Sequence, residues 1–370
     1  MTKIRLRGIW FQVHKWIGLL LAVLVVPLCL SGSVLVWGDA VDAALHPARH
    51  ADMGKATLAP SVYLAAAQQR LGGQERIARI TLPDRGGAVE VSAVEAGKSR
   101  GRPVRTTVYL DPRDAHVIDM ADSGSGVLRT MHILHGSLMV PGVGRQVVGW
   151  VGVAMFVSAL SGIWLWWPTV GSWIRGLRWR RHRNFDTNLH HLFGFWIALP
   201  LAILAVTGAW ISFPQFFGRF DAPQPAREGP SRAERFRARP LAEPATAFEQ
   251  VLVRAAAVAP GNVRSVTWPT NIQPSWSVET VGGTARVADT GDSVSLRSAR
   301  GRGEGRRDAD SLSRTMRTIH DGHDMPFVWQ VIVFLGGILP TILAITGVIM
   351  WWRARGWRAK QAARAKARRR

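Results

Sequence analysis

The chain has 370 residues, of which 47% are hydrophobic, and a formal net charge of +22. This length would suggest two or three domains in a soluble protein, but four long apolar stretches place the chain among membrane proteins instead. Cys29 is the sole cysteine and lies inside the first apolar stretch, which excludes a fold held together by disulfide bonds.

The four apolar stretches are predicted to be transmembrane helices, at roughly 14–37, 145–167, 190–213 and 326–352. The first has 24 residues and carries no charge after Lys15. As a helix it would be about 36 Å long, enough for a hydrocarbon core of about 30 Å. Four spans place both termini on the same side of the membrane.

The basic residues indicate which side that is. The segments before the first span, between the second and third spans and after the fourth span together hold 18 lysines and arginines and one acid, Asp186. By the positive-inside rule this face, with both termini, is cytoplasmic. The C-terminal tail RARGWRAKQAARAKARRR could contact nucleic acid, but its position beside a span favours a role in topology and contact with anionic membrane lipid. We expect no nucleic-acid partner.

Two internal repeats relate the halves of the chain. At an offset of 176, a histidine is followed by a glycine four residues later and by a hydroxyl residue and a second glycine near the end of the span: His14, Gly18, Ser31 and Gly32 match His190, Gly194, Thr207 and Gly208. At an offset of 185, an Arg-Thr-Met segment precedes a histidine, which lies 27 residues before another glycine: Arg129, His135 and Gly162 match Arg314, His320 and Gly347. The pattern indicates a duplicated unit of span, polar domain and span.

Each of the two large loops is predicted to hold a small α+β module. In the first, a helix in 61–73 precedes strands in 75–83, 87–95 and 105–119, the last with a turn at Asp111-Pro112. In the second, a Pro-, Ala- and Arg-rich linker at 221–245 precedes a helix in 246–260 and strands in 264–269, 275–280 and 283–296. A Gly/Arg-rich segment, 299–310, leads to the fourth span.

These features give the following expected organisation. The expected segments are a lead-in and first span at 1–37, a first α+β domain at 38–128, a histidine segment and second span at 129–169, a basic loop at 170–189, a third span at 190–213, a linker and second α+β domain at 214–315, a histidine segment and fourth span at 316–352, and a basic tail at 353–370. The fold class is thus a mainly α membrane protein with two α+β domains.

The modules resemble the PepSY domain. The whole arrangement is similar to the PepSY-associated transmembrane helix family of bacterial inner-membrane proteins, which includes siderophore-iron reductases. The strings that carry this resemblance are WFQVHKWIG, MHILHG, LHHLFG, TIHDG and VYLDPRDAHVI. The resemblance implies an inner-membrane protein with periplasmic loops and a ferric siderophore as substrate. The second module lacks the aromatic-Asp-Pro turn of the first, which leaves its boundaries open.

Four histidines in register at the ends of the spans predict a cofactor site, because ionisable residues at membrane depth are rare and usually functional. His14 and His190 begin spans at the cytoplasmic face, and His135 and His320 precede spans at the outer face. Two imidazoles on different helices suit the two sides of an iron porphyrin. We therefore expect two b-type haems, one at each face, although an interfacial role for the histidines is the alternative.

Other residues could assist these histidines. Gly18 and Gly194 lie one helical turn beyond His14 and His190, where a flat macrocycle could approach the backbone, or where two helices could simply pack closely. Arg129 and Arg314 could pair with haem propionates, or could be ordinary interfacial arginines. Second-choice ligands are His132, His191 and His323.

A separate outer metal site is a further alternative, since imidazole and carboxylate suit iron, zinc or copper. It would be formed by His132, His135, His320, His323 and Asp324. The remaining histidines, His46, His50, His116 and His182, are expected at the surface.

The sequence has no P-loop, no Gly-rich dinucleotide fingerprint and no recognisable Ser/His/Asp set. Electrons would therefore come from a separate cytoplasmic donor, and no residue is expected to be catalytic in its own right. We predict a di-haem electron-transfer protein that reduces a periplasmic ferric siderophore in iron acquisition. The alternative is a haem-free, membrane-anchored PepSY protein that binds peptide or regulates a protease. The oligomeric state does not follow from the sequence.

Overall fold

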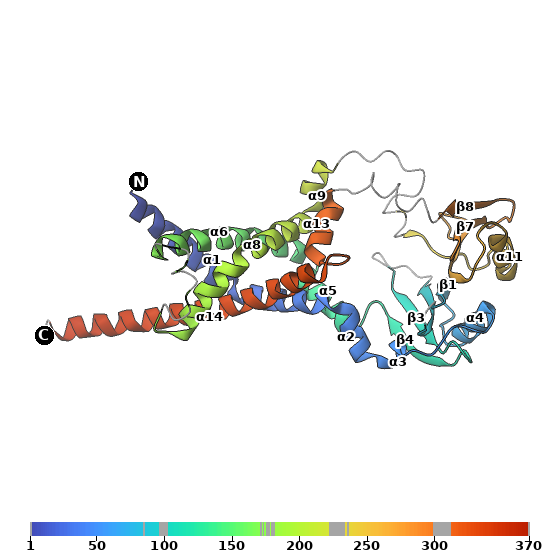
Figure 1. Cartoon of the computed structure of the whole chain (residues 1–370), viewed down its shortest axis with the longest axis horizontal. Coiled ribbons are helices and arrows are strands. Elements are labelled where there is room, and N and C mark those ends of the chain that lie inside the picture. The colour runs from blue at the N-terminus through green and yellow to red at the C-terminus, as the bar shows by residue number, and fades with distance from the viewer. Residues whose placement is uncertain are drawn as a thin grey trace. The chain divides into compact units, whose positions relative to one another are not determined.

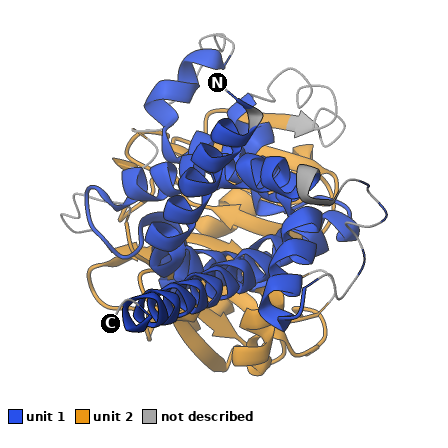
Figure 2. Ribbon diagram, turned by 90° about the vertical axis from the view of Figure 1, so that its left-hand side faces the viewer, with its two compact units in different colours: residues 1–38, 130–223, 310–370 blue, residues 39–129, 224–309 orange. Residues whose placement is uncertain are grey.

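The computed structural model describes residues 2–83, 86–95, 103–170, 172, 174, 178, 182–221, 234, 237–298 and 312–368. The chain forms two compact units, each built from segments that are far apart in the sequence (Figure 2). The first unit comprises Met1–Gly38, Thr130–Pro223 and Asp310–Arg370, and the second comprises Asp39–Arg129 and Gln224–Ala309. Most of the expected linker, and the Gly/Arg-rich segment at 299–310, lie outside the described residues.

The first unit is a bundle of four long helices (Figure 1): α1 (Lys3–Val36), α6 (Gly144–Val170), α8 (Phe185–Ser212) and α14 (Phe327–Ala367). Each is long and apolar enough to cross a membrane, which confirms the expectation of four spanning helices. Both α1 and α8 pack against α6 and α14. Consequently α1 and α8 occupy diagonal positions in the bundle, with α6 and α14 between them.

Small residues allow close contact between the helices of the bundle. A side chain at Gly337 of α14 would collide with the Cys29 carbonyl and the Ser33 hydroxyl of α1. The Ser33 hydroxyl also donates a hydrogen bond of 2.8 Å to the Phe334 carbonyl. A Cβ at Gly152 of α6 would lie 3.1 Å from the Ala205 carbonyl of α8. In lipid the hydrophobic effect does not drive helices together as it does in soluble bundles. Close backbone contact of this kind holds the helices together instead.

Short helices precede two of the spans. These are α5 (Val127–Ser137), which carries His135 and leads to α6, and α13 (Leu312–Asp321), which carries His320 and packs against α8. Residues with positive φ follow both helices, with Leu138 and Met139 after α5 and Gly322 and Asp324 after α13. These left-handed residues end α5 and α13. His135 and His320 therefore each lie on a short helix that is separate from the span that follows it. The chain after α8 adds α9 (Pro214–Phe217) and the 3-10 turn η1 (Gly218–Phe220).

The second unit contains an eight-stranded antiparallel sheet of order β4-β3-β2-β1-β5-β6-β7-β8. The strands of the first half are β1 (Glu75–Thr81), β2 (Val89–Glu95), β3 (Arg105–Leu110) and β4 (Val117–Asp122). Those of the second half are β5 (Val263–Thr267), β6 (Ser275–Thr280), β7 (Gly283–Ala288) and β8 (Val294–Ser298). Helix α4 (Pro60–Gln68) packs on the first half and α11 (Phe248–Val258) on the second. Helices α2 (Gly38–Leu45) and α3 (Pro47–His50) were not expected from the sequence.

The two halves share one hydrophobic core. Ile80 of β1 is paired with Val91 of β2 and with Val266 of β5, and all three are fully buried. The same core includes residues of both α4 and α11. The two modules expected as separate domains therefore form a single unit. The physical reason is that β1 and β5 would otherwise each be an exposed sheet edge, and pairing them removes both edges.

Candidate functional site

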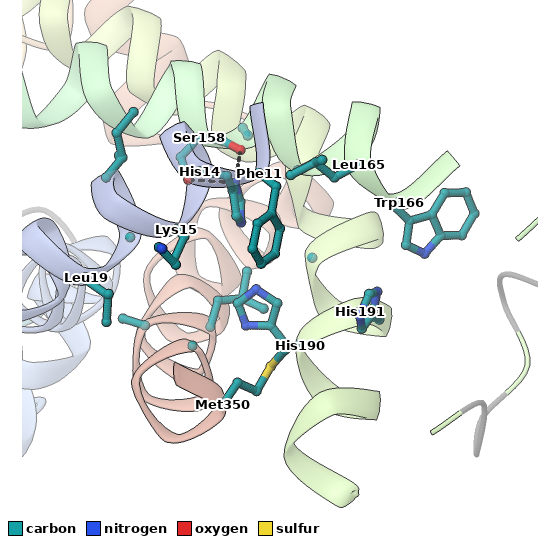
Figure 3. A pocket seen from close by; sticks show the side chains of 18 of the residues that line it. Phe11, His14, Lys15, Leu19, Ser158, Leu165, Trp166, His190, His191 and Met350 are labelled. Atoms are coloured by element: carbon teal, nitrogen blue, oxygen red, sulfur yellow. Dashed lines mark hydrogen bonds between the residues drawn. The ribbon is translucent and has the colours of Figure 1, made fainter. Parts of the chain in front are cut away.

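The four in-register histidines form two close pairs in the helix bundle. The ring centroids of His14 on α1 and His190 on α8 are 6.3 Å apart, with the ring planes at 87° (Figure 3). Those of His135 on α5 and His320 on α13 are 6.0 Å apart, with the planes at 40°. Each pair therefore combines one histidine from each half of the chain, as the repeats predict.

These separations suit two ligands on opposite sides of a single metal ion. A metal–imidazole nitrogen bond is about 2 Å long and the centre of the ring lies about 1 Å further on, so two such ligands have centroids about 6 Å apart. Direct hydrogen bonding between two imidazoles or ring stacking would bring the centroids closer. Both pairs are thus spaced to hold something between them.

In the inner pair, the Nδ1 atom of each histidine is held by a neighbouring span. His14 Nδ1 lies 3.1 Å from both the carbonyl oxygen of Ser158 and the hydroxyl of Ser161 on α6. His190 Nδ1 lies 3.0 Å from the hydroxyl of Thr346 on α14. Because the Thr346 hydroxyl already donates to the Ile342 carbonyl at 2.7 Å, it accepts from His190. Both rings therefore carry their proton on Nδ1.

The outer pair repeats this arrangement on the other two spans. His135 Nδ1 donates to the Leu28 carbonyl of α1 at 2.8 Å. His320 Nδ1 donates to the Leu204 carbonyl of α8 at 3.1 Å and lies 3.0 Å from the Thr207 hydroxyl. Among the described residues, no hydrogen bond involves Nε2 of any of the four histidines. A neutral ring with Nδ1–H bonded and the Nε2 lone pair free is the usual state of a metal-ligating histidine.

Four glycines make room for the four rings. A Cβ at Gly162 would lie 3.2 Å from His14 Cε1, and one at Gly347 would lie 3.5 Å from His190 Cε1. For the outer pair, the corresponding distances are 2.7 Å from Gly32 to His135 Cε1 and 2.9 Å from Gly208 to His320 Cε1. Each histidine thus packs against a glycine on a different helix.

A hydroxyl residue precedes each of these glycines. These Ser/Thr-Gly pairs are Ser161-Gly162, Thr346-Gly347, Ser31-Gly32 and Thr207-Gly208. Three of the four hydroxyls lie within 3.1 Å of the histidine Nδ1, and that of Ser31 donates to the Leu28 carbonyl, which also accepts from His135. Sequence reasoning noticed these positions as repeats but did not assign them to the histidines. The signal was present in the recurrence of Ser/Thr before Gly on every span.

A cavity of about 730 Å³ surrounds the inner pair (Figure 3). Its wall is mainly apolar and includes Gly18 and Gly194. A Cβ at Gly18 would have no neighbour within 4 Å, and one at Gly194 would meet only Leu343, at 3.9 Å. Both glycines therefore leave open space on the side of the histidines. The volume is in the range of pockets that hold a small organic cofactor, about 300–1,000 Å³.

Three cations also line the cavity: Arg7 and Lys15 on α1 and Arg358 on α14. Arg7 donates to the Leu165 carbonyl at 2.8 Å, which places its guanidinium at the cavity wall. Sequence reasoning counted these residues only as signals of the cytoplasmic face, because they lie in the basic lead-in before the first span and in the basic tail after the fourth. They are suitable partners for carboxylate groups of a ligand.

The other candidates occupy different surroundings. His191 lines the same cavity, but its ring stacks on His182 at 4.7 Å and lies 6.5 Å from His190. His132 and His323 are exposed, as are Arg129 on α5 and Arg314 on α13. Within the described residues, no group of three or more His, Cys, Asp or Glu is arranged to hold a metal ion, so the alternative outer site with Asp324 is not formed.

Asp321 is an acidic neighbour of the outer pair that sequence reasoning missed. It follows His320 directly and lies 3.7 Å from Arg317. Burial raises the pKa of the Asp321 carboxyl, although Arg317 and the nearby histidines act in the opposite direction. The outer pair therefore has a partly buried carboxyl group beside it.

The family model of the PepSY-associated TM region matches residues 11–354, nearly the whole chain. The chain belongs to this PepSY-associated family. The match includes all four paired histidines, both halves of the sheet, the whole of the second and third spans and most of the first and fourth. No curated protein sequence matches the chain. As a member of the PepSY-associated family, the chain is a multi-pass membrane protein with an attached α+β unit.

Proposed function

We propose that this PepSY-associated protein is a di-haem b-type cytochrome that carries electrons across the bacterial inner membrane and reduces a periplasmic ferric siderophore. The observation that supports this most directly is the pair of histidine pairs, with centroids 6.3 and 6.0 Å apart and every Nδ1 already bonded. Four rings with the same tautomer and spacing are difficult to explain by packing alone.

At the inner pair the residues present fit a haem in both chemistry and space, and at the outer pair the two imidazoles fit it in chemistry. His14 and His190 would ligate the inner iron, and His135 and His320 the outer one. The cavity next to the inner pair is apolar, and Gly18 and Gly194 leave room beside the ligands. Haem iron supplies reversible one-electron chemistry. The protein's contribution would be to fix the orientation of the four rings through their Nδ1 bonds.

The two pairs lie in separate layers of the bundle. On α1, His14 belongs to the inner pair, whereas the Leu28 carbonyl, 14 residues further along, holds His135 of the outer pair. At the rise of an α-helix, this separation is about 21 Å along α1. Two redox groups in such layers would form a route through most of the membrane's thickness.

The charge pattern supports a direction for this route. The basic segments lie at the ends of the spans next to the inner pair, so the inner pair would face the cytoplasm and the second unit the periplasm. The order of helices, histidines and strands is the same in both halves, which supports a duplicated origin. Resemblance to siderophore-iron reductases supports a ferric chelate as the acceptor, with release of ferrous iron as the purpose.

Proteoliposomes can test the whole reaction. The haem-loaded protein would be reconstituted with a reductant enclosed in the lumen and a ferric siderophore outside, together with a chelator that becomes coloured on binding ferrous iron. Colour should develop outside only when the protein is present. It should be lost in His14→Ala and His320→Ala but retained in His132→Ala. Equal rates with protein-free vesicles would contradict the proposal.

A further inference from the structure

The last span does not end at the membrane surface. Helix α14 runs without a break from Phe327 to Ala367, 41 residues in all. Trp351 and Trp352 are typical of a membrane interface, yet the helix continues for 15 residues beyond them. At the α-helical rise this extension is about 22 Å long. In Figure 1 the C-terminal end of α14 projects well past the neighbouring helices of the bundle.

This extension is strongly basic and fully exposed. Residues 353–368 contain no acid and seven cations, all of them exposed: Arg353, Arg355, Arg358, Lys360, Arg364, Lys366 and Arg368. Arg353 is bonded to Asp186 on α8, and Arg355 lies over the Trp351 ring. The cations further along, Lys360, Arg364 and Lys366, point into solvent. The surface at 353–368, here called the basic extension, is therefore available to a partner.

Two properties of the basic extension argue against a lipid surface as its main partner. A helix that lies in the interface needs a broad apolar face, but the only large apolar residue here is Trp357, which is surrounded by Ala, Gly, Gln and cations. In addition, the helix continues the direction of the span, whereas the headgroup layer is only about 5–8 Å thick on each side. Most of the basic extension thus projects into water.

The first turns of the basic extension also reach the cavity that contains the inner histidine pair. Arg358 and Ala354 line the same cavity as His14 and His190. Arg7 and Lys15 of α1 line it too, so cations from both α1 and the basic extension lie at the cavity wall. A partner that docked on the basic extension would be beside the redox site. A nucleic acid bound to the basic extension would gain nothing from lying near a redox site.

We propose that the basic extension docks an acidic, water-soluble electron-carrier protein, which supplies the electrons for the inner site. This inference rests on the proposed function and names its partner. In each encounter the reduced carrier, a flavin or iron–sulfur protein, would give up one electron to the ferric haem iron that His14 and His190 would hold. Encounters between redox proteins use small interfaces and rely on charge for speed, as a row of exposed cations provides.

The test measures how fast an acidic carrier reduces the full-length, haem-loaded protein in nanodiscs of neutral phosphatidylcholine. The probe is reduced flavodoxin, mixed in a stopped-flow instrument at low ionic strength. The variant Lys360→Gln/Arg364→Gln/Lys366→Gln changes three cations that do not line the cavity. We expect its bimolecular rate constant to fall about tenfold and to lose most of its dependence on salt.

Two matched variants control for charge. Lys360→Arg/Arg364→Lys/Lys366→Arg keeps every charge and should keep the wild-type rate. Lys55→Gln/Arg70→Gln/Arg105→Gln removes three exposed cations from the second unit and should also leave the rate unchanged. Reduction by dithionite, which needs no docking, should be equal in all four proteins.

The possible outcomes separate the inference from the function on which it rests. Equal flavodoxin rates for the wild type and the triple Gln variant would overturn the docking proposal. So would loss of the effect when phosphatidylglycerol is added to the nanodiscs, since the cations would then be engaged with lipid. A wild-type protein that shows no haem bands after dithionite would instead refute the proposed function.

Discussion

The imidazole of His135 on α5 packs against Gly32 on α1 so closely that a Cβ at position 32 would lie 2.7 Å from its Cε1 atom. The ring cannot turn away freely, because its Nδ1 donates to the Leu28 carbonyl of the same helix at 2.8 Å. Gly32 therefore makes room for the ring of His135, a candidate ligand that is more than a hundred residues away in the sequence.

Replacing this glycine should disturb the outer site alone. In Gly32→Ala the new methyl group would push the His135 ring off its hydrogen bond, so we expect the outer haem to be lost or bound at least about tenfold more weakly. The inner haem should remain. Gly38→Ala is the matched control, because a Cβ there has no neighbour within 4 Å. Haem titration followed by absorbance measures the binding of both haems. Unchanged binding in Gly32→Ala would contradict this role of Gly32.

The hydrogen bond from His190 to Thr346 should tune the inner site. Thr346→Val keeps the shape of the side chain but removes the acceptor for Nδ1–H, which makes the ring a weaker donor to the metal. We expect the midpoint potential of the inner haem to rise and that of the outer haem to stay constant. Thr346→Ser should restore the wild-type potential. Redox titration measures the two midpoint potentials. Equal potentials of the inner haem in the wild type and in Thr346→Val would count against this role of Thr346.

The contact between α1 and α14 should be sensitive to a single methyl group. In Gly337→Ala the Cβ would collide with the Cys29 carbonyl, a backbone atom that cannot rotate away. Overpacking of this kind costs about 1–3 kcal/mol, so the thermal unfolding temperature in detergent should fall by several degrees. Gly356→Ala, on the same helix with no neighbour within 4 Å, should leave it unchanged. Equal melting temperatures for Gly337→Ala and the wild type would show that α1 and α14 can move apart without loss of stability.

The shared core of the second unit predicts that its halves unfold together. Ile80→Ala removes a fully buried side chain at the β1–β5 junction and should cost about 2–5 kcal/mol. Hydrogen exchange should then accelerate in peptides from both α4 and α11. Leu296→Ala, at a position that is 50% exposed, should have little effect on either. Acceleration in α4 alone would mean that the two modules are independent.

The sequence was sufficient to predict the spans and the partners within each histidine pair. Uncharged runs of more than 20 residues specify a spanning helix almost independently of context. The repeats place His14 in register with His190 and His135 with His320, so the pairing follows from the alternation of span directions. Both predictions depend on local pattern or on internal symmetry, which a single chain displays.

Features that depend on contacts between distant segments were not predictable in the same way. The Ser/Thr-Gly pairs hold histidines from other helices, and nothing in the spacing says which helix will be opposite. The β1–β5 pairing joins strands whose edges could equally have been covered by a loop. In the sequence, Arg358 belongs to a basic tail that is typical of a topology signal. Only the unbroken length of α14 brings it to the cavity.

The haem content of single-histidine variants tests the central claim most directly. The protein, purified from haem-replete cells, should contain two b-type haems per chain by the pyridine haemochrome assay. His14→Ala and His190→Ala should each contain one, as should His135→Ala and His320→Ala, whereas His191→Ala should keep two. A colourless wild-type protein, as a haem-free peptide-binding role would give, or two haems retained in His14→Ala would contradict the account.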